Sequence, residues 1–159
     1  MENIKYKLTL LSQIAKELNN RNLTWAIGAS MLLYFKGIVS EFQDIDIMVT
    51  EDEIAIVKEV LLAFGKLQAP KPNVSYKTKH FLEFQVNGVD IDIMAGFVIL
   101  NEDQEHHFPL KKEHIQDFTE LNGIRIPLQS LAEWRTYYQL MGRTEKVNLI
   151  DAWQQTHVY

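Results

Sequence analysis

Apolar residues recur every three or four positions through the first twenty residues of the chain, with polar residues between them. The apolar positions are Ile4, Leu8, Leu11, Ile14, Ala15 and Leu18. Because an α-helix makes one turn in about 3.6 residues, this spacing predicts an amphipathic helix that ends near residues 19–22. The apolar run at 23–27 predicts a short buried strand that leads into Gly28.

An Asp-x-Asp pattern follows in the next predicted strand. Residues 29–36 are typical of a short helix closed by Gly37, and the chain then returns as a strand with Asp44 and Asp46. Side chains alternate faces along a strand, so both carboxylates point to one side and the intervening isoleucines point into a core. Asp is depleted in strands and costly to bury unpaired, which favours a chemical role for this pair. The structural alternative is an edge strand with solvated acids.

A second Asp-x-Asp pattern occurs in a predicted hairpin. Residues 80–86 and 89–94 form its two strands, and the Asn-Gly dipeptide between them suits a type I′ turn. The returning strand places Asp90 and Asp92 on one face. The residues alone leave open which of the two lies nearer to the first acidic pair.

Capping patterns predict the remaining helices. The segment 50–53 has the pattern of a capping box and opens a helix that Gly65 ends. The segment 130–133 repeats the pattern and opens a helix that Gly142 closes. A last amphipathic helix with Val147, Ile150 and Trp153 completes the chain.

The segments between these elements are expected to be loops and one more hairpin. Residues 67–75 contain two prolines and predict a loop, and residues 101–107 predict a polar surface loop. Its adjacent histidines, His106 and His107, favour a surface position over a metal site, because neighbouring residues of a strand point in opposite directions. Residues 115–127 predict a short hairpin around a second Asn-Gly turn.

Composition narrows the class of protein. The chain has 159 residues, 47% apolar and 23% charged, which is ordinary for one globular domain. It has no cysteine, which excludes disulfides and thiolate zinc sites. The net charge of −5 argues against an extended nucleic-acid-binding surface, so a small anionic substrate would need a local basic pocket or a metal. No apolar run reaches the ~18 residues of a membrane span and no signal-peptide pattern occurs, so we expect a cytoplasmic protein without membrane contact.

The order of these features resembles the nucleotidyltransferase superfamily, whose core is shared by DNA polymerase beta, tRNA-nucleotidyltransferases and small antibiotic nucleotidyltransferases. The matching residues are Gly28-Ala29-Ser30 after a strand, Gly37 at the end of the following helix, and the acidic strand Asp44-Ile45-Asp46-Ile47. The resemblance covers roughly the first two thirds of the chain.

The resemblance implies a fold of the α/β (α+β) class. We expect a short mixed β-sheet flanked by helices, with the helices on one side of the sheet, and a small C-terminal helical element. Residues 1–128 would form the nucleotidyltransferase-like core, and residues 129–159 would form the helical element packed on it within a single structural domain.

The resemblance also implies that Asp44 and Asp46 are catalytic metal ligands. It places a third carboxylate on a neighbouring strand, a role that we assign to Asp92 with Asp90 as the competitor. Three carboxylates on adjacent strands suit hard divalent cations, and Mg²⁺, with two ions expected, is the natural occupant. Asp92 would also accept the proton of the attacking hydroxyl.

The nucleotide is expected to bind beside these acids. Gly28, Ala29 and Ser30 would receive a phosphate at the start of the helix, and Arg143 and Lys146 would reach a triphosphate. Two departures from the family pattern are visible. An alanine stands where a second Gly or a Ser is usual, and no basic residue precedes the first acidic pair.

The sequence therefore predicts a metal-dependent nucleotidyltransferase that moves a nucleoside monophosphate from an NTP to a hydroxyl of a small molecule or macromolecule. ATP is one of the expected nucleotides. The alternative is a catalytically inactive nucleotidyltransferase-like binding or regulatory protein, and a third is a structural domain with solvated acids. The expected partners are the NTP and a hydroxyl-bearing acceptor. The short chain makes an acceptor cleft shared with a second copy or a partner protein a further expectation.

Overall fold

Strand β2 (Ile45–Val49) lies at the centre of the main sheet and carries Asp46. It pairs antiparallel with β1 (Trp25–Ile27) and parallel with β5 (Val89–Ala95). The isoleucines of the two Asp-x-Asp patterns are fully buried, whereas the aspartates between them are not. The alternation predicted from the sequence thus determines which face of the sheet is core and which carries the acids.

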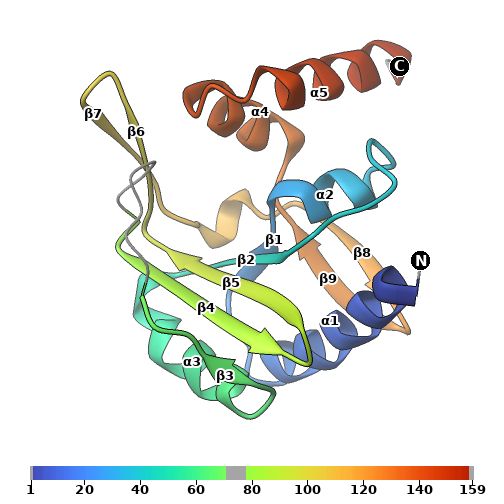
Figure 1. Ribbon diagram of the computed structural model, residues 1–159, viewed down its shortest axis with the longest axis vertical. Helices are drawn as coiled ribbons and strands as arrows, with labels where there is room; N and C mark the ends of the chain where they lie inside the picture. Colours follow the sequence, from blue (N-terminus) through green and yellow to red (C-terminus); the bar gives the residue numbers. More distant parts are fainter. Residues whose placement is uncertain (1, 71–77, 158–159) are drawn as a thin grey trace.

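The computed structural model describes residues 2–70 and 78–157, and its main sheet has seven strands in the order β3-β4-β5-β2-β1-β9-β8 (Figure 1). The remaining strands of this sheet are β3 (Lys66–Leu67), β4 (His80–Val86), β8 (Asp117–Leu121) and β9 (Ile124–Leu128). A separate two-stranded sheet contains β6 (Phe97–Asn101) and β7 (Gln104–Phe108). The sheet is mixed, as expected, because β2 pairs parallel with β5 and β1 parallel with β9.

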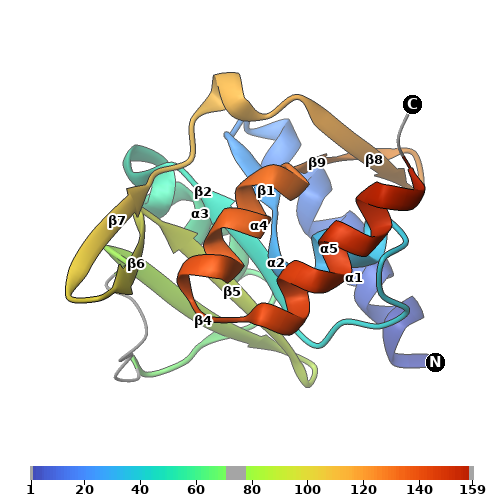
Figure 2. The same cartoon turned by 90° about the horizontal axis from the view of Figure 1, so that it is seen from above.

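Helices cover both faces of the main sheet, where one side was expected (Figures 1 and 2). Helices α1 and α3 lie on one face, and α2, α4 and α5 lie on the face that carries Asp46. The α-helices are α1 (Glu2–Asn20), α2 (Ala29–Phe35), α3 (Ile54–Leu62), α4 (Leu131–Leu140) and α5 (Thr144–Thr156). None of the helices in residues 2–70 and 78–157 combines the length and apolar character needed to cross a bilayer.

The hairpin predicted at residues 80–94 and the helix predicted at the start of the chain are confirmed. Two other local predictions are wrong. Thr50 does not cap the next helix: its hydroxyl donates to Glu53, whose carboxylate accepts the backbone N–H of Thr24, and a short 3-10 turn precedes α3. The segment 101–107 is not a loop, since most of it forms β7 and pairs with β6. The expected loop at 67–75 falls largely outside the described residues.

The C-terminal helices form as predicted. The Ser130 hydroxyl accepts the backbone N–H of Glu133, and the Glu133 carboxylate accepts the backbone N–H of Ser130, which completes a capping box at the start of α4. Arg135 of α4 donates to both carboxylate oxygens of Asp151 of α5, at 2.6 and 3.0 Å. This bidentate pair joins α5 to α4.

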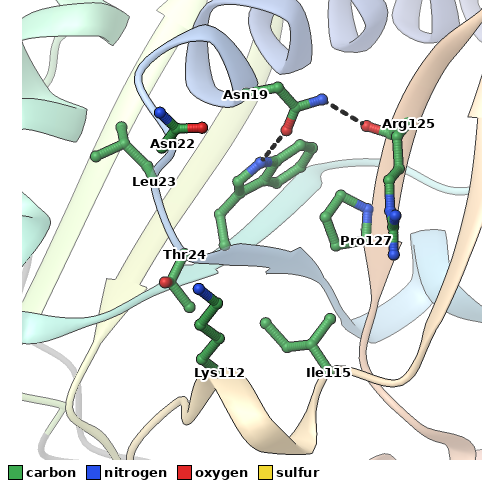
Figure 3. Close-up of a pocket in the computed structure, with 9 residues that line it drawn as sticks. Asn19, Asn22, Leu23, Thr24, Lys112, Ile115, Arg125 and Pro127 are labelled. Atoms are coloured by element: carbon green, nitrogen blue, oxygen red, sulfur yellow. Dashed lines mark hydrogen bonds between the residues drawn. The ribbon is translucent and has the colours of Figure 1, made fainter.

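Asn19, at the end of α1, ties the helix to two strands. Its Oδ1 accepts the indole N–H of Trp25 at 2.9 Å, and its Nδ2 donates to the backbone oxygen of Arg125 at 2.9 Å (Figure 3). Trp25 is 1% exposed, so its N–H depends on this partner. A cavity of about 350 Å³ lies beside these residues, with Thr24 and Lys112 in its wall.

Replacement of Asn19 with alanine is expected to lower the free energy of unfolding by about 1–2 kcal/mol, because it leaves a buried indole N–H without its acceptor. Urea denaturation measures this loss. The matched control is Asn20→Ala, one position along the same helix and exposed. Equal effects of the two substitutions would show that the bridge does not contribute.

Candidate active site

Asp46 and Asp92 lie side by side on adjacent parallel strands. They are register partners across β2 and β5, and their carboxyl groups are within hydrogen-bonding reach of each other. Asp44 lies just before β2 and, like the other two, is partly buried. Strand pairing thus brings together acids that are 46 residues apart in the sequence.

The register also distinguishes the two acids of β5. Asp92 is opposite Asp46 on one side and opposite Glu83 of β4 on the other, so three carboxylates form a row across three strands. Asp90 is exposed, is opposite Gln85, and accepts a 3.4 Å hydrogen bond from its amide. Sequence reasoning missed Glu83, although counting back from the Asn-Gly turn would have placed it opposite Asp92.

Burial and like charges disfavour ionisation of these acids. Burial first, then the charges of Asp92 and Asp44, raise the pKa of Asp46 well above its usual value. Burial, together with the charges of Asp44 and Glu83, raises the pKa of Asp92 to about 7. Burial and the charge of Asp90 raise the pKa of Asp44, while the Lys7 ammonium acts in the opposite direction. A cation placed between the carboxylates would relieve this repulsion.

The donor set was tested against a divalent cation. In residues 2–70 and 78–157, no three His, Cys, Asp or Glu side chains are arranged around a single ion position. Asp46 and Asp92 are close enough to share a hydrogen bond, and Oδ1 of Asp92 is buried with no hydrogen-bond partner. Hard carboxylate oxygens are the ligands that Mg²⁺ prefers. The pair therefore fits such an ion, and Asp44 lies near enough for its charge to raise the pKa of both acids.

Gly28 leaves room for the protein's own side chains. Its φ of −130° is open to any residue, but a Cβ there would lie 2.5 Å from Gln129 Oε1 and 2.6 Å from the Trp134 ring. Trp134 donates its indole N–H to the same Gln129 oxygen at 2.6 Å. The left-handed conformation of this turn belongs to Ala29, with φ of +56°. The space beside Gly28 is thus filled by Gln129 and Trp134 of the protein itself.

A cavity of about 230 Å³ lies between the sheet and the C-terminal helices. Four of the five residues expected to bind the nucleotide line it, and Gly28 does not. The lining residues are Ala29, Ser30, Asp46, Met94, Phe97, Trp134, Tyr138, Met141, Arg143 and Lys146. The cavity therefore joins the helix start, one acid and two cations that come from distant parts of the chain.

Aromatic and charged side chains of α4 and α5 shape this cavity. Trp134 and Tyr138 of α4 are buried and also form its wall. Burial, with a smaller effect of Asp46, raises the pKa of Tyr138 to about 12, so the phenol stays neutral. Arg143 donates to Glu145 at 2.7 Å, which lowers the pKa of that carboxyl and partly occupies the guanidinium.

The fold and the adjacent acids define a protein of the nucleotidyltransferase superfamily, as the sequence predicted. Residues 10–153 match the family model described as aminoglycoside-2''-adenylyltransferase. Because the match covers most of the sequence, the chain belongs to this family.

Solved structures share the fold. A crystal structure from Thermotoga maritima, described as that of a putative nucleotidyltransferase, matches with a TM-score of 0.73 and 23% identity over 96% of this chain and 94% of that one. ANT(2'')-Ia in complex with adenylyl-2''-tobramycin matches with a TM-score of 0.58 and 12% identity, over 96% and 99% of the two chains. A solution structure of ANT(2'')-Ia, an antibiotic-resistance factor, matches with a TM-score of 0.59 and 11% identity, over 96% and 91%. Among curated protein sequences, none matches this chain.

The raised pKa of Asp92 predicts the sign of a pH effect. Its ordinary pKa is 3.8 and its folded value is about 7, so between these limits the folded protein holds a proton that the unfolded chain has lost. The stabilising contribution of the protonated group is complete below the lower limit and is lost as the pH rises through the upper one.

We therefore expect the free energy of unfolding in metal-free buffer to fall between pH 4 and 7, and to fall less steeply in Asp92→Asn. Urea titrations at several pH values in a chelator measure the difference in slope. Asp52→Asn, an exposed acid that does not contribute to these pKa shifts, should keep the wild-type slope. A slope unchanged in Asp92→Asn would contradict the assignment.

Proposed function

We propose that this protein is a divalent-metal-dependent nucleotidyltransferase that transfers a nucleoside monophosphate from an NTP to a hydroxyl of a small acceptor. The observation that carries this proposal is the side-by-side placement of Asp46 and Asp92 on parallel strands. Asp46 also lines a cavity that contains Ser30 and the cations Arg143 and Lys146. Carboxylates for a metal and cations for a polyphosphate are the two components that such a reaction needs.

Asp44, Asp46 and Asp92 would hold the metal. When bound, Mg²⁺ supplies charge neutralisation at the α-phosphate and at the attacking and leaving oxygens. The acceptor oxygen forms a bond to the α-phosphorus, and the bond from that phosphorus to the pyrophosphate breaks. Asp92 receives the proton of the acceptor hydroxyl, and a pKa near neutrality suits a group that takes up and releases a proton at physiological pH.

The cavity would bind the nucleotide. Arg143 and Lys146 line it together with Ser30, so they would neutralise the phosphates that leave as pyrophosphate. Trp134 and Tyr138 offer ring surface that excludes water from the reacting groups. Their fixed positions reduce the reorganisation needed when the substrate binds.

For the acceptor, we propose a polyhydroxylated molecule with protonated amines, and ATP as the donor. The family description and the adenylyl-2''-tobramycin complex of ANT(2'')-Ia support this choice. The local charge supports it independently, because Glu83 and Asp90 add two carboxylates beside the three assigned to the metal. These extra acids would attract an amine-bearing acceptor to the part of the site beside β4 and β5.

Replacement of Asp44, Asp46 or Asp92 with asparagine is expected to lower kcat/KM by at least about 100-fold, because each change removes a charged oxygen from the reacting centre. Pyrophosphate release from ATP with Mg²⁺ and a panel of aminoglycosides measures the rate. Asp52→Asn, which changes an exposed acid before α3, is the matched control and should retain most of the activity. Binding of ATP without turnover in the wild-type protein would instead support an inactive, regulatory relative.

Arg143→Ala and Lys146→Ala are each expected to raise the KM for the nucleotide by about tenfold, since each removes one phosphate-binding charge. Steady-state kinetics at saturating acceptor measure the change. Lys58→Ala, an exposed position on the opposite face of the sheet, serves as the control. An unchanged KM in both variants would exclude this cavity as the phosphate site.

A further inference from the structure

We infer that Lys7 is a positioning residue of this site, because it holds the backbone segment that places Asp44. This inference rests on the proposed function only in assuming that the acids bind a divalent cation. Lys7 belongs to α1, 35 residues before its first contact in the acidic segment. Neither the spacing of acids nor the turn motif identifies it from the sequence.

The Lys7 ammonium contacts the segment just before Asp44 directly. Its Nζ donates to the backbone oxygen of Gln43 at 2.7 Å and to that of Phe42 at 3.1 Å. The same nitrogen lies 5.4 Å from the centre of the Phe42 ring. One side chain thus binds two consecutive carbonyl groups, which fixes the orientation of the peptide units that lead into Asp44.

Asp44 needs such a constraint because it lies outside the sheet. Strand β2 begins at Ile45, and residues 39–44 belong to no helix or strand. Phe42 anchors this segment by packing, with 5% of its surface exposed and its ring 5.1 Å from that of Tyr34. Packing of one ring leaves the peptide planes after it free to rotate, and the two hydrogen bonds from Lys7 remove that freedom.

A positioning role of Lys7 and a purely electrostatic role of Lys7 predict opposite changes in the affinity of the site for a cation. If Lys7 acts through its charge alone, it repels the cation, and removal of the charge tightens metal binding. If it acts by placing Asp44, its removal costs a ligand and weakens metal binding. A role confined to general stability predicts a lower melting temperature with unchanged metal affinity of the folded protein.

The test measures Mn²⁺ binding by calorimetry at neutral pH, on variants shown by circular dichroism to be folded. We expect Lys7→Met to weaken Mn²⁺ binding about tenfold. Lys7→Arg, which keeps a donor to both carbonyls, should retain most of the affinity. Lys16→Met, an exposed lysine of the same helix, is the control and should bind as the wild type does.

A double-mutant cycle identifies Asp44 as the residue through which Lys7 acts. If Lys7 only positions that ligand, the double variant Lys7→Met/Asp44→Asn binds Mn²⁺ no more weakly than Asp44→Asn alone. Unchanged or tighter binding in Lys7→Met, additive losses in the double variant, or no Mn²⁺ binding by the wild-type protein would each overturn the inference. Mn²⁺ binding without nucleotide transfer would overturn the proposed function alone.

Discussion

The repulsion between Asp46 and Asp92 is the constraint on which the site depends. Parallel pairing of β2 with β5 places these carboxylates side by side, and burial removes much of the water that would screen them. Two such groups remain together only if they share a proton or a cation neutralises them. The fold therefore holds the acids in an arrangement that is costly when both are charged, and under the proposed function a divalent ion would offset this cost.

Local patterns were sufficient to predict the elements that carry the acids. The alternation of Ile and Asp determines which face of β2 and β5 is buried, and the Asn-Gly turn between β4 and β5 determines their register. The capping box at Ser130 likewise depends on residues three positions apart. Each of these features is decided by neighbours in the sequence, which is why they could be predicted without a structure.

Features that depend on distant contacts could not be predicted in the same way. Glu53 matched a capping pattern but accepts a hydrogen bond from Thr24, a contact between segments 29 residues apart. Lys7 reads as one polar position of an amphipathic helix until α1 lies beside the acidic segment. Gly28 has the sequence context of a ligand turn, yet Trp134, more than a hundred residues later, occupies the space beside it. The placement of β9 against β1 and the helices on both faces are equally non-local.

The cavity beside Asp46 is lined by residues from distant parts of the chain, among them Ala29 and Lys146. During synthesis on a ribosome, the acids of β2 and β5 are made long before α4 and α5. A nascent chain that has completed β5 still lacks the residues of α4 and α5 that line this cavity. Under the proposed function, nucleotide binding would therefore depend on α4 and α5 being packed against the sheet.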